Sequence, residues 1–467
     1  MFDNNIRKNI SITFIANIIS LIVSLLSTLL IPKIMGVTEY GYWQLYLFFI
    51  SYAGLLHLGV CDGIYLTSGG MEYKDLNKRT LKGQFLLLSI VLIFICSCIV
   101  FISGVVEKDI GTKIVIIYTC VGAFFHIQKT FFLMILQSTN RLKEYSVITI
   151  IDRVIFAGFV IAFILIKHVS YQSIMCADII GRILSLVLVF YYVKDILFEK
   201  VADFNDVVHE FNNNLRCGIQ LLLSGIASNF IIGFVRLSIK NNWSIEEFGK
   251  ISLSLSVVNM ILSFVNMAAI VFFPIIKRQN KEKQIMTFEH MENFLHIICF
   301  GVLCFAGLGK MIIDIWLPHY KESTIFMILL FPICIYESET SMVLNTYLKA
   351  LRKEKSLFIV NISIMIASMC FSYVASNVIR SLVIAVLGID ILIYLRAMIL
   401  KMILYRKFSK ENLVISILND TILFAVYLVL YCNFNIEISS IIYLIVYVVF
   451  IIIKRKSLCK AIDFFFK

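Results

Sequence analysis

Long apolar runs separated by short polar segments recur along the whole chain. Many of these runs approach 20 residues, the length that an α-helix needs to cross a hydrocarbon core of about 30 Å. The pattern predicts fourteen transmembrane helices, and the tightest connections between spans are Lys167–Ser170 and Ser376–Ser381. The predicted spans are Ser11–Met35, Tyr42–Leu66, Gly83–Ile102, Ile114–Leu136, Tyr145–Ile166, Tyr171–Val193, Leu215–Ile239, Phe248–Ile275, Phe294–Ile313, Thr324–Leu348, Leu357–Asn377, Leu382–Tyr405, Leu413–Cys432 and Ile438–Ile453.

Two short polar motifs occur twice, in the same order. Val37–Gly41 and Ile245–Gly249 both combine an acidic residue, an aromatic residue and glycine, and they lie 208 residues apart. Gln137–Lys143 and Lys349–Lys355 each follow a long apolar run and lie 212 residues apart. Nearly equal offsets indicate an internal duplication. We therefore expect a six-helix lobe at residues 1–194, a cytoplasmic linker at 195–214, a second six-helix lobe at 215–407, and an extra two-helix hairpin with a basic tail at 408–467.

Composition supports a membrane protein. Hydrophobic residues make up 60% of the chain, the mean hydropathy is +0.91, and only 15% of the residues are charged. Soluble domains carry about 25% charged residues. The chain is therefore predicted to be an all-α, multi-pass membrane protein.

Basic residues are concentrated on one side of the predicted membrane. With a cytoplasmic N-terminus, 28 of the 42 Lys and Arg residues, Lys401 among them, fall in cytoplasmic segments, nine in outer segments and five within spans. Positive charges favour cytoplasmic loops, so both termini are predicted to be cytoplasmic. The net charge of +12 then reflects topology and attraction to anionic headgroups, and we expect no nucleic-acid partner.

Five short segments carry a resemblance to a known family: Gly36–Gly41, Leu58–Val60, Phe273–Ile275, Ile315–Ser323 and Lys349–Lys355. They resemble motifs of the Wzx-type branch of the multidrug/oligosaccharidyl-lipid/polysaccharide (MOP) exporter superfamily, and the resemblance covers about residues 8–405. It implies a MATE-like fold with two lobes around a central cavity. An even number of spans per lobe agrees with that, because it gives a parallel repeat. Many relatives carry an Asp-Arg pair in the seventh span, whereas this chain has Val235 and Arg236.

The resemblance also implies a function. The chain would be a flippase that moves an undecaprenyl-pyrophosphate-linked oligosaccharide, an O-antigen or capsular repeat unit, to the outer leaflet of the bacterial cytoplasmic (inner) membrane. Alternating access would drive the movement, as one step of polysaccharide or lipopolysaccharide biosynthesis. Its partners would be this lipid-linked glycan, membrane lipids, H⁺ or Na⁺ as coupling ion, and the polymerase and chain-length proteins of the pathway. No cofactor, metal or catalytic residue is expected.

Cations inside the spans are the first candidates for a substrate site. A charge at the bilayer centre costs about 3 kcal/mol on insertion scales, so it usually faces protein or water. Lys129, Arg153 and Arg182 fall in spans four, five and six of one lobe. Grouped cations in a low-dielectric cleft bind pyrophosphate well. We predict that these three residues, with Arg236 of the second lobe, bind the substrate head.

Acidic residues inside the spans are candidates for ion coupling or gating. They are Asp178, Glu337, Glu339 and Asp390. Glu337 and Glu339 cannot share a helix face, since two residues correspond to about 200° of rotation. Pro332 lies five residues before Glu337 and would loosen the backbone of that span.

Each charged residue also has a purely structural interpretation. Asp178 and Arg182 are four residues apart and can neutralise each other. Lys129 can extend to the inner interface, Arg153 can pack as a pair with Asp152, and Arg236 lies near the outer end of its span.

Two other classes of protein stay open at this point. An ion-coupled drug or cation antiporter of the same superfamily would need a more acidic first lobe. A membrane-embedded polymerase or acyltransferase would need catalytic residues on a sizeable outer loop, and the longest predicted outer loop has about ten residues.

Overall fold

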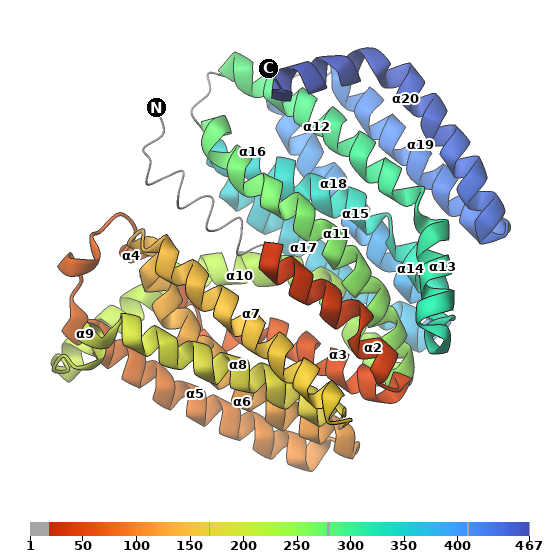
Figure 1. Ribbon diagram of the computed structural model, residues 1–467. Coiled ribbons are helices and arrows are strands. Elements are labelled where there is room, and N and C mark those ends of the chain that lie inside the picture. Colours follow the sequence, from red (N-terminus) through yellow and green to blue (C-terminus); the bar gives the residue numbers. More distant parts are fainter. Residues whose placement is uncertain (1–17, 168, 278–280, 409–410, 467) are drawn as a thin grey trace. The chain divides into compact units, whose positions relative to one another are not determined.

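The computed structural model describes residues 18–167, 169–277, 281–408 and 411–466, and all of the secondary structure in these ranges is helical (Figure 1). Residues 11–17 of the first predicted span, the basic N-terminal residues and Lys467 lie outside them. The contacts divide the chain into two compact units, Met1–Ile226 (unit 1) and Ala227–Lys467 (unit 2). The boundary falls within α10 (Phe204–Asn242), which includes the end of the predicted 195–214 linker.

Unit 1 is a bundle of apolar helices. It consists of α2 (Ile31–Ile34), α3 (Val37–Ser51), η1 (Ala53–His57), α4 (Val60–Thr67), η2 (Tyr73–Asp75), α5 (Lys78–Val106), α6 (Ile110–Ser138), α7 (Leu142–Leu165), α8 (Tyr171–Tyr192), α9 (Lys194–Leu197) and the first part of α10. Helix α8 packs against both α6 and α7, and α6 also packs against α5 (Figure 1). Phe85, Phe131, Phe132 and Phe190 form the aromatic part of the core between α5, α6 and α8.

Unit 2 contains the rest of α10 and the later helices. These are α11 (Ile245–Lys277), α12 (Lys281–Leu303), α13 (Ala306–Trp316), η3 (Pro318–Tyr320), α14 (Ser323–Leu330), α15 (Ile333–Ser338), the π-helical turn η4 (Glu339–Leu344), α16 (Asn345–Ala350), α17 (Glu354–Tyr373), the π-helical turn η5 (Val374–Ile379), α18 (Leu382–Phe408), α19 (Glu411–Asn433) and α20 (Ile436–Phe466). Helix α20 lies along α12, and α19 packs against α20 (Figure 1). The last two helices therefore belong to unit 2.

The prediction of an all-helical membrane fold is confirmed. Every predicted span overlaps a helix, and eight helices are long and apolar enough to cross a membrane, or eleven if each of three bent pairs counts as one span. Ile18–Ile34 and Thr421–Asn433 are shorter apolar helices. The total of fourteen spans and the cytoplasmic position of the termini stay predictions.

The repeated motifs adopt the same local structure. Val37 and Ile245 both begin helices. Asn140 (φ 62°) and Arg352 (φ 53°), 212 residues apart, are both left-handed residues that end a helix. In both turns the N–H of the following residue donates to the carbonyl oxygen five residues earlier, 2.8 Å away, as in a Schellman motif. This match at the level of single hydrogen bonds supports the internal duplication.

The second predicted span is broken. Val37–His57 and Val60–Thr67 meet at an angle of 60°, because Leu58 (φ 55°) and Gly59 (φ 94°) are both left-handed. The sequence predicted one continuous helix, Tyr42–Leu66. The bend brings α4 against the start of α10 so closely that a Cβ on Gly63 would lie 1.9 Å from the Asn214 carbonyl oxygen.

Polar side chains fix this crossing of α4 and α10. Thr67 Oγ1 donates to Asn214 Oδ1 at 2.9 Å, and Asn214 Nδ2 donates to Gln84 Oε1 of α5 at 2.8 Å. Asn214 is buried, so each bond satisfies a group that would otherwise lose its solvation. The crossing therefore depends on glycine at its closest point and on an amide at its centre.

Candidate functional site

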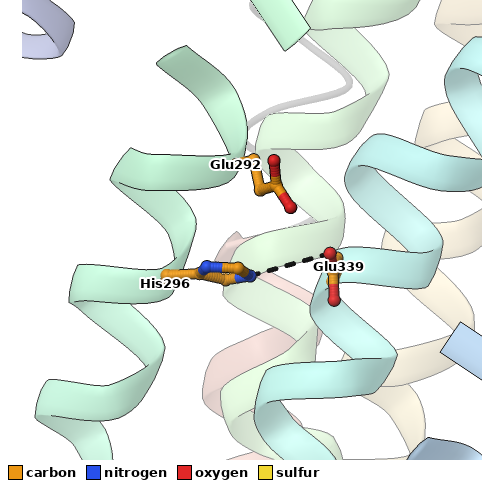
Figure 2. A group of neighbouring side chains, drawn as sticks. All are labelled: Glu292, His296 and Glu339. Carbon is orange, nitrogen blue, oxygen red and sulfur yellow. Dashed lines mark ion pairs between the residues drawn. The ribbon is translucent and has the colours of Figure 1, made fainter. Parts of the chain in front are cut away.

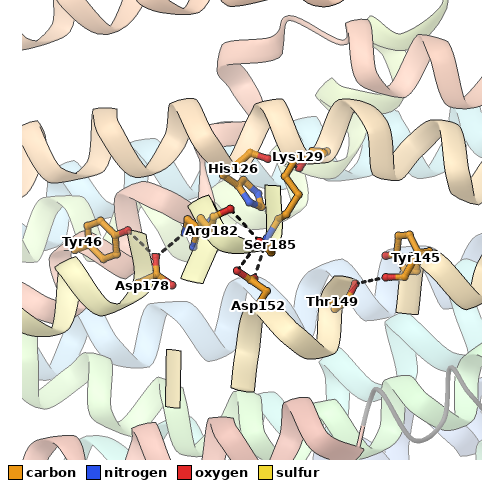
Figure 3. Close-up of polar contacts among 10 residues, drawn as sticks. Tyr46, His126, Lys129, Tyr145, Thr149, Asp152, Asp178, Arg182 and Ser185 are labelled. Atoms are coloured by element: carbon orange, nitrogen blue, oxygen red, sulfur yellow. Dashed lines mark hydrogen bonds and ion pairs between the residues drawn. The ribbon is translucent and has the colours of Figure 1, made fainter. Parts of the chain in front are cut away.

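Unit 1 contains two buried ion pairs side by side (Figure 3). Lys129 Nζ of α6 lies 2.8 Å from Asp152 Oδ2 of α7. Arg182 Nε lies 2.6 Å from Asp178 Oδ2, one turn earlier on α8. Lys129, Asp178 and Arg182 are buried, so each charge depends on its partner for solvation.

Neutral groups complete this network. The Tyr46 hydroxyl of α3 donates to Asp178 Oδ2 at 2.6 Å. The Ser185 hydroxyl lies 3.2 Å from Asp152 Oδ1 and 2.9 Å from the Arg182 carbonyl oxygen, so it lies between the two ion pairs (Figure 3). Four helices thus converge on the site.

The side chains of Asp152 on α7 and Ser185 on α8 can approach to 3.2 Å because these two helices pack closely. A Cβ on Gly181 would lie 3.0 Å from the Asp152 carbonyl oxygen, tighter than most side chains allow. The glycine therefore keeps Asp152 close to Ser185, and Asp152 in turn holds Lys129.

Arg153 differs from the other two predicted cations. It is exposed, and among the described residues no carboxylate lies within ion-pair distance of it. Lys129, Arg153 and Arg182 all lie close enough to His126 to act on it electrostatically. Three cations and two carboxylates, Asp152 and Asp178, leave the group with a charge of +1, and Arg153 carries the excess.

The structure brings the three predicted cations of the first lobe together, but two of them are paired. The i,i+4 pair of Asp178 and Arg182 forms as the structural interpretation anticipated, and Lys129 is buried against Asp152. Arg236 belongs to unit 2, where it donates to Ser252 Oγ at 2.9 Å and lies 5.1 Å from the Phe248 ring. The binding roles of these residues stay predictions.

The acidic residues predicted in unit 2 have different environments. Glu337 forms an ion pair with Arg396 of α18, which also donates to Ser228 Oγ at 2.7 Å. Asp390 of α18 is fully buried, and neither of its oxygens has a hydrogen-bond partner among the described residues. A carboxyl group in that setting is stable only in its neutral, protonated form.

Glu339 is part of a second buried charge cluster (Figure 2). Lys401 Nζ of α18 lies 2.8 Å from Glu339 Oε1 and 2.5 Å from Glu292 Oε1 of α12. His296 Nε2, one turn after Glu292, lies 3.6 Å from Glu339 Oε1. The Tyr405 hydroxyl donates to Glu292 Oε2 at 2.6 Å.

Sequence reasoning missed most of this cluster. The predicted span began at Phe294, which left Glu292 outside it, and His296 received no role. Lys401 was counted among the cytoplasmic residues and received no role in a site, whereas its side chain is fully buried within α18. The available signal was the helical i,i+4 spacing of Glu292 and His296.

Ligand atoms of Glu292, His296 and Glu339 lie within 4.8 Å of one another, a spacing that suits a metal ion. A metal ion does not fit there, because the Lys401 ammonium already lies against both carboxylates. The lysine supplies the positive charge that an ion would otherwise bring.

Comparisons with known proteins agree with the fold. The family model described as "Polysaccharide biosynthesis protein" matches residues 6–280. No curated protein matches the chain significantly.

Solved structures match nearly the whole chain. A structure of the lipid II flippase MurJ in an inward closed conformation is 14% identical and has a TM-score of 0.69 over 95% of this chain and 99% of that one. An inward-facing MATE family transporter of the MOP superfamily is 12% identical (TM-score 0.61, 90% and 98% covered). A MOP superfamily transporter from Pyrococcus furiosus is 14% identical (TM-score 0.52, 87% and 96% covered). The apolar helices and this shared fold make the chain a multi-pass membrane protein.

Proposed function

Because the chain belongs to the polysaccharide biosynthesis protein family, we propose that it is a flippase for a lipid-linked glycan. The substrate is an undecaprenyl-pyrophosphate-linked oligosaccharide, the repeat unit of an O-antigen or a capsule. It moves from the inner to the outer leaflet of the bacterial cytoplasmic membrane. The two six-helix lobes, 1–194 and 215–407, carry out alternating access, the 408–467 hairpin accompanies the second lobe, and both termini are cytoplasmic.

The single observation that carries this proposal is the uncompensated cation beside the two buried ion pairs of unit 1. Lys129 and Arg182 are neutralised by Asp152 and Asp178, so they shape the site but add little net charge. Arg153 is exposed and adds the excess charge. A guanidinium presents forked donors that match phosphate oxygens, and a site of charge +1 favours an anionic pyrophosphate over a neutral or cationic molecule.

Coupling to an ion gradient follows from the acidic residues. Glu337, Glu339, Asp390 and Asp178 are the candidates, and H⁺ or Na⁺ is the coupling ion. One charge crossing the membrane is worth about 2.3 kcal/mol per 100 mV, enough to favour one state of the transporter by more than tenfold. The polymerase and chain-length proteins of the pathway are the expected protein partners.

Arg153→Gln should weaken binding of undecaprenyl pyrophosphate by about ten- to hundredfold. A hydrogen bond to a charged group contributes about 1.5–3 kcal/mol, and 1.4 kcal/mol is tenfold in affinity. Binding to the purified protein measures this directly, and export of surface polysaccharide in a strain that lacks its own flippase should fall in parallel. Arg182 is unsuited to this test, because its removal leaves Asp178 buried and unpaired.

Lys143→Gln is the matched control, since Lys143 is exposed on the same helix, ten residues before Arg153. It should bind and export as the wild type does. Equal affinity of Arg153→Gln and the wild type would remove the substrate role of this site.

A further inference from the structure

A polar groove of about 370 Å³ lies in unit 1, between the last turn of α4 and the first turns of α5 and α10. Two stripes of polar side chains line it. On α10 the stripe consists of Asp206, Glu210 and Asn214, which follow one another at intervals of four residues, and on α5 it consists of Asn77 and Gln84, seven residues apart. Residues at these intervals share a helix face, so two helices each present a polar face to the groove.

Close packing of the backbones fixes the shape of the groove. A Cβ on Gly83 of α5 would lie 2.3 Å from Val207 Cγ2 of α10, and a Cβ on Gly63 of α4 would lie 1.9 Å from the Asn214 carbonyl oxygen. The two glycines therefore let the start of α10 lie directly against α5 and α4. The hydrogen bond from Asn214 to Gln84 joins α10 to α5 at the buried end of both stripes.

The buried end of the groove offers hydrogen-bond donors. Gln84 is 2% exposed, and its Oε1 accepts from Asn214, whereas its Nε2 donates to none of the described residues. The buried Ser68 hydroxyl of α4 and Asn77 Nδ2 likewise donate to no residue in the described ranges. Buried amide and hydroxyl groups are nearly always hydrogen-bonded, so a ligand or water is needed to satisfy these donors.

The open end of the groove offers acceptors. Asp206 is exposed and Glu210 is partly exposed, and neither carboxylate accepts a hydrogen bond from a described residue. His209 Nδ1 lies 3.9 Å from Glu210 Oε1, beyond hydrogen-bond distance. With a neutral imidazole the lining has a charge of −2, because no lysine or arginine is among the described residues that form it.

This arrangement matches the chemistry of a sugar ring. A sugar hydroxyl both donates and accepts, so it needs carboxylate or carbonyl oxygens together with amide or hydroxyl donors. The C–H faces of a sugar also need apolar surface, which Met71, Leu76 and Leu81 provide. Small-molecule sites have volumes of about 300–1,000 Å³ and a few placed polar groups. The negative lining disfavours a pyrophosphate, which separates this groove in kind from the cationic site at Arg153.

We propose that the groove binds uncharged sugar rings of the lipid-linked glycan at the side of the membrane from which the glycan is loaded. The identity of the substrate rests on the flippase function proposed above, whereas the affinity for sugar rests on the lining residues and their hydrogen bonds. The connection between α4 and α5, which contributes Met71 and Asn77, is one of the segments that the basic residues predict to be cytoplasmic. The sugars would therefore be bound before translocation begins.

Calorimetry on the purified protein tests the groove with two separate probes. One is the free repeat oligosaccharide, released from its lipid carrier in the strain that encodes the protein and freed of phosphate; the other is undecaprenyl pyrophosphate without sugar. Asp206→Asn/Glu210→Gln should bind the oligosaccharide at least tenfold more weakly, since a hydrogen bond to a charged acceptor is about twice as strong as one to a neutral amide. It should bind undecaprenyl pyrophosphate as tightly as the wild type or more tightly, because two negative charges are gone.

Asp203→Asn is the matched control. Asp203 is exposed, precedes Asp206 by three residues and does not line the groove. Asparagine and aspartate are equally good at the N-terminus of a helix, so this variant should bind both probes as the wild type does. Arg153→Gln should show the reverse of the double variant, with weaker binding of undecaprenyl pyrophosphate and unchanged binding of the oligosaccharide.

Three results would overturn the groove as a sugar site. They are no binding of the oligosaccharide by the wild type, equal binding by the wild type and Asp206→Asn/Glu210→Gln, and binding of Mg²⁺ alone in place of the sugar. If any of them occurs while the wild type still flips a lipid-linked glycan in liposomes, the flippase function stands without the groove. If the oligosaccharide binds as expected and no glycan crosses the membrane, the flippase function is overturned and the sugar site stays supported.

Discussion

Lys401→Met should destabilise the protein by about 3–5 kcal/mol, the usual cost of removing one partner of a buried ion pair. Lys401 is fully buried and lies against Glu339 at 2.8 Å and Glu292 at 2.5 Å. Without its ammonium the two carboxylates face each other in a dry interior. The midpoint of denaturant unfolding in detergent micelles and the amount of protein in the membrane should both fall sharply.

Lys355→Met is the control for this change, since Lys355 is exposed at the start of α17 in the same unit. It should unfold as the wild type does. The triple variant Glu292→Gln/Glu339→Gln/Lys401→Met removes both carboxylates together with the ammonium, so it should recover most of the lost stability. A stable Lys401→Met protein would mean that the lysine does not hold the two carboxylates.

Gly63→Ala should be strongly disruptive. Its Cβ would lie 1.9 Å from the Asn214 carbonyl oxygen and 2.5 Å from the carbonyl carbon, so α4 and α10 have to separate. Overpacking of this kind costs about 1–3 kcal/mol and occasionally more. Separation of the helices would also break the hydrogen bonds from Thr67 to Asn214 and from Asn214 to Gln84.

Gly158→Ala gives the opposite expectation. Gly158 is exposed on α7, and nothing lies within 4 Å of an added Cβ. Alanine there should leave the unfolding midpoint unchanged or raise the stability by about 0.5–1 kcal/mol, because glycine is a poor helix former. Equal stability of both variants would show that α4 and α10 are not held in this close crossing.

The periodic features of the sequence predicted much of the fold. Apolar runs located the helices, and two short motifs predicted a duplication, with which the matching turns at Asn140 and Arg352 agree. These signals are readable because membrane helices need long apolar segments and because a left-handed helix end is a local property of the chain. The break at Leu58 and Gly59 was missed, since one glycine in an apolar run does not by itself indicate a bend.

The candidate sites were predictable only in part. Charged residues inside spans are rare, so Lys129, Arg153, Arg182 and Glu339 were identifiable from sequence alone. Their partners depend on which helices pack together, and no local pattern contains that information. Lys401 lies near the end of its span, where sequence cannot distinguish a lysine that reaches the interface from one that turns inward to a carboxylate.

Translocation by the purified protein tests the central claim most directly. Liposomes are prepared with a fluorescent undecaprenyl-pyrophosphate glycan, and a membrane-impermeant quencher measures how much label each leaflet holds. The wild type should equilibrate the glycan between the leaflets without changing it chemically. Arg153→Gln should do so at least tenfold more slowly, because it loses a charge-assisted hydrogen bond to the pyrophosphate of about 1.5–3 kcal/mol, and about 1.4 kcal/mol corresponds to a factor of ten. A labelled phospholipid should stay in its leaflet. A glycan that remains in its original leaflet, or one that the protein modifies covalently, would contradict the flippase.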